Sequence, residues 1–214
     1  MSDNKPIQLG LCCLNTILRQ QRPTVFASRK MIIRSVRQKG IAVLKIKIKQ
    51  NLKDILTMMD WNETNGIKVF RLSSEIFPHK SNPKVEDYTF DFALDLLKQI
   101  GEKSKQLNQR LTFHPGQYNV VGTPSEASFN QTICNLKYQA DVLDLMGLDN
   151  NSVMVIHGGG MYGDKEKTKE REFFRVEHPK LDKPWATTKS EKVSILEKLA
   201  QANKVVDDLI EINE

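Results

Sequence analysis

The amino-acid sequence predicts an α/β fold of the TIM-barrel type that is only partly complete. Short apolar runs at residues 7–14, 67–72, 110–113 and 152–156 resemble buried strands, with helical patterns between them. The last three runs begin about 43 residues apart, which is typical of β–α units in a parallel sheet. An open doubly wound sheet fits the same alternation, but no GxGxxG or GxxxxGK motif follows the first run.

The helices are predicted from apolar residues that recur at steps of three and four. Gly66 and Gly147 follow two of these patterns, and a glycine at that position commonly ends a helix. The segment 29–49 is basic and suggests an excursion in the first connection, while 164–189 suggests part helix and part loop. The four helices are expected near residues 51–65, 90–100, 129–143 and 190–212.

The chain length limits how much of a barrel is present. The four strands use about 158 of the 214 residues. Eight units of this size would need on the order of 340 residues. We therefore expect about four βα units and a C-terminal helix.

Composition and charge limit the classes of protein to which this chain can belong. Hydrophobic content of 39% and charged content of 27% are typical of a soluble globular protein. No apolar run approaches the ~20 residues of a membrane helix, and the first residues lack a signal-peptide pattern, so an intracellular protein is expected. The net charge of +6 is compatible with a polyanionic partner such as nucleic acid.

Three of the four histidines follow predicted strands. His114 and His157 end the third and fourth strands, and His79 follows the second after a short loop. In a barrel these positions converge on one face, where three imidazoles can hold one divalent ion. The alternative is three unrelated histidines, each hydrogen-bonded to nearby backbone. His178, in the charged segment, is not part of this set.

The stretch HPGQY, residues 114–118, follows the third strand. Pro115 and Gly116 suit a sharp turn, which would present Gln117 and Tyr118 beside the histidines. A tyrosine can stack on an unpaired base, and a glutamine can fill a vacated base position. An ordinary surface tyrosine is the alternative.

These motifs identify a resemblance to the UV-damage endonucleases, especially those of the fungal type. The resemblance covers most of residues 7–165 and is carried by LGLCCLN, RLSSE with PH, HPGQY and HGGG, in that order. Beyond residue 165 it fades. The expected division is therefore 1–165, the N-terminal half of such a barrel, and 166–214, a divergent charged segment with a C-terminal helix.

The resemblance implies a DNA-repair endonuclease that nicks DNA on the 5′ side of ultraviolet photoproducts. It implies a divalent metal, manganese in the family, with zinc or magnesium as alternatives. Its histidine ligands match His79, His114 and His157, its lesion-probing pair matches Gln117 and Tyr118, and an asparagine near the lesion matches Asn15. The compartment would be the nucleus or mitochondrion of a eukaryote, or otherwise the cytoplasm.

The family's later carboxylate ligands are not recognisable in this sequence. Two alternatives therefore remain open: a truncated homologue that binds DNA without cleaving it, or another metal-dependent barrel enzyme such as an apurinic-site endonuclease. The expected partner is double-stranded DNA containing photoproducts. The half-barrel further suggests self-association or a missing C-terminal half, because its edge strands lack neighbours.

Overall fold

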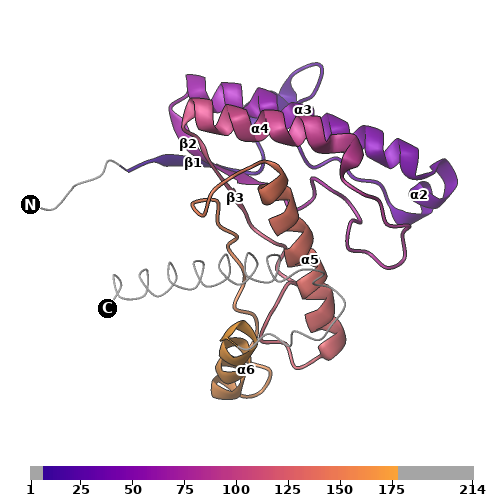
Figure 1. The fold of residues 1–214 in the computed structure, drawn as a ribbon, viewed down its shortest axis with the longest axis vertical. Coiled ribbons are helices and arrows are strands. Elements are labelled where there is room, and N and C mark those ends of the chain that lie inside the picture. Colours follow the sequence, from indigo (N-terminus) through magenta and orange to yellow (C-terminus); the bar gives the residue numbers. More distant parts are fainter. Residues whose placement is uncertain (1–6, 178–214) are drawn as a thin grey trace, which may run out of the picture. The chain divides into compact units, whose positions relative to one another are not determined.

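The computed structural model describes residues 7–177 (Figure 1). Its Cα trace divides into two compact units, which are described separately. Among the described residues, the first comprises 7–112 and 145–152, and the second comprises 113–144 and 153–177. None of the helices in residues 7–177 is long and apolar enough to cross a membrane. The predicted helix at 190–212 lies outside the described residues.

A small sheet forms the centre of the first unit. Its strand order is β1–β2–β3, and β1 pairs with β2 in parallel, with Gly10 opposite Val69. The predicted second and third strands are confirmed. The fourth is reduced to one parallel bridge between Phe113 and Met154 in the second unit. The strands are β1 (Leu9–Cys12), β2 (Ile67–Leu72) and β3 (Arg110–Phe113).

The expectation that the first strand is buried on both faces was wrong. Leu9 is 65% exposed, and Ile7, directly before the strand, is 96% exposed. By contrast, Phe70 and Leu72 of β2 and Leu111 of β3 are almost completely buried. The physical reason is position, because β1 is an edge strand with β2 as its neighbour in the sheet.

Two long helices cover the sheet of the first unit, where α3 packs against α4 (Figure 1). Helix α3 begins ten residues before the predicted start, because Leu44 and Ile48 continue its buried face with a period of four. It ends before Gly66, which has φ +69°, as the sequence predicts. The helices of this unit are α1 (Thr16–Gln20), α2 (Ile33–Lys39), α3 (Ile41–Thr64), the 3₁₀ helix η1 (Asp91–Ala93) and α4 (Leu94–Leu107).

The second unit contains most of α5 and all of α6. Helix α5 spans Glu126–Leu145 and buries Ile133, Leu136 and Leu143, so the predicted third helix is confirmed. Helix α6 spans Lys165–Glu177, within the segment predicted to be part helix. Arg171 of α6 donates from Nε to the Gly122 carbonyl oxygen at 3.3 Å, which ties α6 to the loop before α5.

Candidate functional site

His114 and His157 lie together in the second unit. Their imidazole rings stack with centroids 4.6 Å apart and an interplanar angle of 29°. Backbone pairing causes this proximity. Phe113 donates its N–H to the Val153 carbonyl at 3.0 Å, and its own carbonyl accepts from Val155 N–H at 2.9 Å. The residues that follow these paired segments are therefore brought side by side.

A cavity of about 820 Å³ opens beside His157. Part of its lining is backbone, because three consecutive glycines follow this histidine. Gly159 has φ +85°, and a Cβ atom there would lie 2.2 Å from Cγ1 of Val120, so only glycine fits. The residues around the cavity are Gln117, Tyr118, Val120, Thr123, Ser128, His157, Gly158, Gly159, Gly160 and Tyr162.

Gln117 and Tyr118 face solvent at this cavity. Tyr118 is 86% exposed, and neither side chain has a hydrogen-bond partner among residues 7–177. An exposed, unpartnered aromatic ring next to a cavity can accept a stacking partner at low cost, because it breaks no contact to do so.

Asn119 holds this loop in shape, a role that sequence reasoning missed. Its N–H and Nδ2 both donate to the Gly116 carbonyl, at 2.9 and 2.8 Å. Its Oδ1 accepts from Nδ2 of Asn135 on α5 at 2.6 Å. Asn119 is 7% exposed, so these bonds are shielded from water. The signal was its place directly after HPGQY, where asparagine commonly closes a turn.

His79 lies in the first unit, in the loop after β2. It has φ +66°, and its Nε2 lies 2.6 Å from the Met31 carbonyl oxygen. Because a carbonyl only accepts, Nε2 carries the proton and Nδ1 keeps the lone pair. Metal-binding histidines commonly donate their second nitrogen to a carbonyl in this way. Nδ2 of Asn82 lies 3.4 Å from that Nδ1.

Asn15 is buried, with 3% exposure. It forms the N-cap of α1, where its Oδ1 accepts from Leu18 N–H at 2.9 Å. Its buried Nδ2 has no hydrogen-bond partner in the described part of the chain. The N-cap explains the asparagine structurally, whereas the predicted contact with a lesion stays a prediction.

The predicted metal site is assembled only in part within each unit. In residues 7–177, no group of three or more His, Cys, Asp or Glu side chains is placed to hold an ion. His114 and His157 are together in the second unit, and His79 belongs to the first. Within the second unit the paired imidazoles offer nitrogen ligands of the kind that divalent ions take, and within the first unit the hydrogen-bonded His79 offers one.

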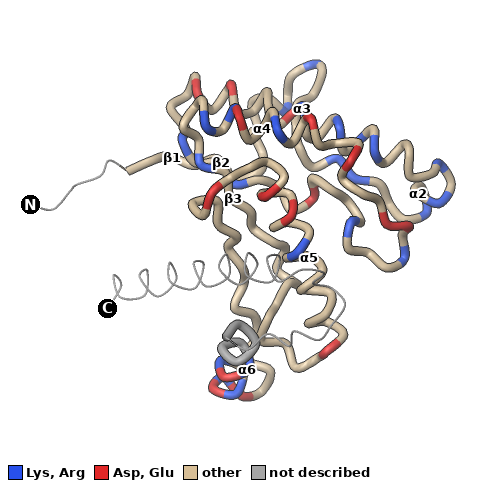
Figure 2. Tube along the Cα trace, viewed as in Figure 1, with Lys and Arg blue, Asp and Glu red and all other residues tan. Residues whose placement is uncertain are grey.

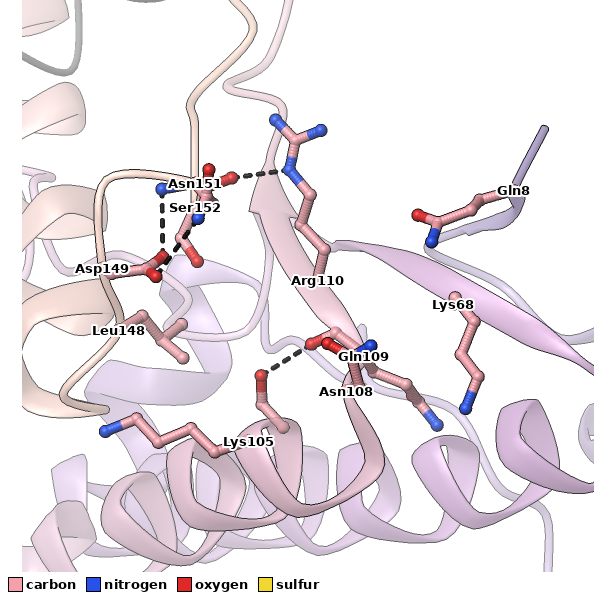
Figure 3. Close-up of a pocket in the computed structure, with 11 residues that line it drawn as sticks. Gln8, Lys68, Lys105, Asn108, Gln109, Arg110, Leu148, Asp149, Asn151 and Ser152 are labelled. Carbon is pink, nitrogen blue, oxygen red and sulfur yellow. Dashed lines mark hydrogen bonds between the residues drawn. The ribbon is translucent and has the colours of Figure 1, made fainter. Parts of the chain in front are cut away.

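A second cavity, of about 310 Å³, lies at the N-terminal ends of β2 and β3 in the first unit (Figure 3). Its polar groups already hold this end of the sheet together. Lys68 Nζ donates to Glu63 Oε2 at 2.6 Å, which lowers the pKa of that carboxyl. Arg110 Nε donates to the Asn151 carbonyl at 2.6 Å. In barrels this face contributes to stability, so we place the functional site elsewhere.

Known proteins are similar to this chain over most of its length. The family model described as UV-endonuclease UvdE matches residues 7–188. The chain belongs to the UV-endonuclease UvdE family. It is 36% identical over 186 residues to the UV-damage endonuclease of Schizosaccharomyces pombe, covering 83% of this chain and 31% of that protein. The matched region extends past residue 165, where the motifs fade.

One further similar protein and one solved structure also match the chain. A protein of Acanthamoeba polyphaga mimivirus, described as a candidate UV-damage endonuclease, is 41% identical over 169 residues, covering 77% of this chain and 51% of that protein. The crystal structure of SacUVDE matches with a TM-score of 0.70 and 27% identity, covering 80% of this chain and 56% of that one. The predicted fold is confirmed, since SacUVDE is a TIM-barrel enzyme. The chain spans about half or less of these relatives' length.

Proposed function

We propose that this member of the UvdE family acts in DNA repair as an endonuclease that nicks DNA on the 5′ side of ultraviolet photoproducts, with a divalent metal bound. One observation carries the proposal: a single cavity brings His157, which stacks on His114, next to Gln117 and Tyr118. One site is thus lined or adjoined by side chains suited to metal binding and by side chains suited to base recognition.

The loop at Gln117 and Tyr118 would recognise the lesion. A photoproduct stacks and pairs poorly, so extruding it from the duplex costs less than extruding normal bases. The Tyr118 ring would then stack in the vacated space, and Gln117 would offer hydrogen bonds to the opposite bases. Asn119 keeps the loop in one conformation, which lowers the entropic cost of inserting it.

His79, His114 and His157 would hold the metal. A bound divalent ion would polarise the scissile phosphodiester and lower the pKa of a bound water molecule. The ion proposed is manganese, as the resemblance implies, with zinc and magnesium as alternatives. The Met31 carbonyl fixes the orientation of the His79 ring, and the partner ring restrains each imidazole of the His114–His157 pair.

A second candidate function is DNA binding without cleavage. It is favoured by the absence, in residues 7–177, of a group of three metal-ligating side chains, including carboxylates. In that case the cavity would recognise lesions without cutting the strand.

The deciding experiment is nicking of supercoiled plasmid by the purified 214-residue chain. Irradiated, unirradiated and depurinated plasmids would be compared, with manganese and with chelator. Nicking confined to irradiated plasmid and to samples with metal is expected. Equal nicking of depurinated plasmid would point to an apurinic-site endonuclease instead.

Two histidine variants control this assay. His114→Ala should abolish nicking, whereas His178→Ala, outside the predicted metal set, should leave it unchanged. Retained nicking by His114→Ala would refute the assigned metal role. A folded chain that binds irradiated DNA but never nicks it would support the second candidate.

A further inference from the structure

The positive charge of this protein is concentrated at one end of its sequence. Residues 1–53 contain 12 Lys and Arg and a single acidic residue, Asp3, while residues 54–214 contain 20 Lys and Arg and 25 Asp and Glu. The net charge of +6 therefore arises entirely from the first quarter of the chain. The rest is slightly acidic.

Much of this charge lies on α2 and on α3 up to residue 53. Figure 2 shows Lys and Arg along both elements. Their exposed cations are Arg34, Arg37, Lys39, Lys49 and Lys53. None of these five forms an ion pair with a carboxylate in residues 7–177. These five residues are called the basic surface below.

Several other cations of the same unit are neutralised. Arg29 forms a largely buried ion pair with Asp54 at 2.5 Å. Lys103 pairs with Asp60 at 2.6 Å, and Lys68 pairs with Glu63 at the same distance. The five cations of the basic surface are not neutralised in this way, so a polyanion would find charges there that it need not share with a carboxylate.

Helix geometry gathers part of this charge on one side. In α3, Ala42, Ile46, Lys49 and Lys53 recur at steps of four, three and four, so they share the solvent face. The opposite face is buried through residues such as Leu44, which is 0% exposed. The burial pattern explains why the cations of this helix point outward.

The basic surface extends beyond the C-terminal ends of the strands. Helix α3 has 24 residues and is about 36 Å long, whereas β2 has 6 residues and spans roughly 20 Å. Because α3 leads directly into the start of β2, its excess length lies past the other end of that strand. His79 contacts the Met31 carbonyl just before α2, so a predicted metal ligand lies at this end too.

We propose that the basic surface on α2 and α3 binds the phosphate backbone of double-stranded DNA, independently of any lesion. This inference rests on the proposed function only for the class of substrate, DNA. Backbone contacts of this kind fix the register of a protein on a duplex and add salt-dependent affinity without reading sequence. The surface would hold undamaged DNA before any lesion is recognised.

The test compares two triple variants with the same loss of charge. Arg37→Gln, Lys49→Gln and Lys53→Gln remove part of the basic surface. Lys84→Gln, Lys98→Gln and Lys105→Gln remove three other exposed, unpaired cations of the same unit. Binding to an undamaged and to an irradiated duplex would be measured by fluorescence anisotropy at several KCl concentrations, with folding checked by circular dichroism.

Each lost phosphate contact should lower the slope of log affinity against log salt by about 0.9. The basic-surface variant should therefore lose about 2.7 units of slope and bind both duplexes at least roughly 10-fold more weakly at 0.1 M salt. The control variant should stay within about twofold of the unaltered chain, because diffuse charge contributes little at this ionic strength.

Equal slopes for the two variants would overturn the inference even if the plasmid is nicked. Slope loss confined to the basic-surface variant would support it even if the plasmid is never nicked, so the two proposals fail separately. Vesicles containing anionic lipid serve as a further arm. Stronger binding to these vesicles than to DNA, lost in the same variant, would overturn the inference in favour of a membrane surface.

Discussion

Two regions of this protein use polar residues in opposite ways. At the N-terminal ends of the strands in the first unit, polar groups such as Lys68 and Ser104 are hydrogen-bonded to neighbouring atoms. Arg110 is likewise bonded to Asn151 (Figure 3). At the loop after β3 in the second unit, Gln117 and Tyr118 have no hydrogen-bond partner in residues 7–177. The contrast indicates that the first region contributes stability, whereas the second leaves its side chains available for a ligand.

The largest effect is expected at the exposed loop. Tyr118→Ala should lower nicking of irradiated plasmid roughly 10- to 100-fold, because stacking on a base contributes about 1–3 kcal/mol. The free energy of unfolding should change by less than about 0.5 kcal/mol, since the ring is 86% exposed. Initial rates and urea unfolding would be measured together.

Tyr118→Phe is the matched control, because it keeps the ring and removes only the hydroxyl. Its nicking rate should stay near that of the unaltered chain. A loss as large as that of the alanine variant would show that the hydroxyl, and not stacking, is what matters at this position.

Substitution of a glycine in the cavity wall should have nearly as large an effect, but on the stability of the fold. Gly159→Ala places a Cβ atom 2.2 Å from Val120 Cγ1 at a residue with φ +85°. It should lower the free energy of unfolding by about 2–4 kcal/mol, from strain and overpacking together. Thermal unfolding checks this loss.

Gly158→Ala is the corresponding control, because no heavy atom lies within 4 Å of its added Cβ. Its unfolding temperature should remain close to that of the unaltered chain. Equal destabilisation by both substitutions would mean that the close approach to Val120 does not decide the need for glycine.

A smaller effect is expected at the N-terminal ends of the strands. Ser104 is 6% exposed, and its Oγ donates to the Gln109 carbonyl at 2.7 Å. Ser104→Ala should lower the free energy of unfolding by about 1–2 kcal/mol, because a buried acceptor loses its donor. Nicking per folded molecule should not change. A selective loss of nicking would contradict a purely structural role for this region.

The smallest effect concerns Glu63 and depends on pH. The hydrogen bond from Lys68 lowers the pKa of this carboxyl, so its stabilising contribution is present at neutral pH and disappears as pH falls through the lowered pKa. Glu63→Gln should therefore destabilise the chain more at pH 7 than at pH 3. Urea unfolding at both values, in low salt, would show it. A loss independent of pH would exclude the ion pair as its cause.

The hydrophobic pattern of the sequence alone was sufficient to predict the strands and helices whose faces are well covered. Strands β2 and β3 and helix α5 follow from their apolar spacing, because burial imposes that spacing directly. The same pattern did not predict the first ten residues of α3, where Lys45 and Lys47 interrupt the apolar residues. It also failed at β1, where an apolar strand is largely exposed.

For the candidate site, the sequence by itself placed His114, Gln117, Tyr118 and His157 directly after strand-like runs, and it identified the family. The tertiary structure decided the stacking of the two histidines, since that depends on the pairing of Phe113 with Met154. The two histidines are close because backbone hydrogen bonds join the segments that precede them.

The roles of two asparagines also depend on contacts that only the tertiary structure shows. The sequence shows that Asn15 and Asn119 are asparagines near predicted turns. Only the structure shows that the first caps α1 and the second holds the loop at Tyr118. The basic segment is likewise visible in the sequence. Only the structure shows that the five cations of the basic surface form no ion pair within residues 7–177, and that α3 is longer than the strand that follows it.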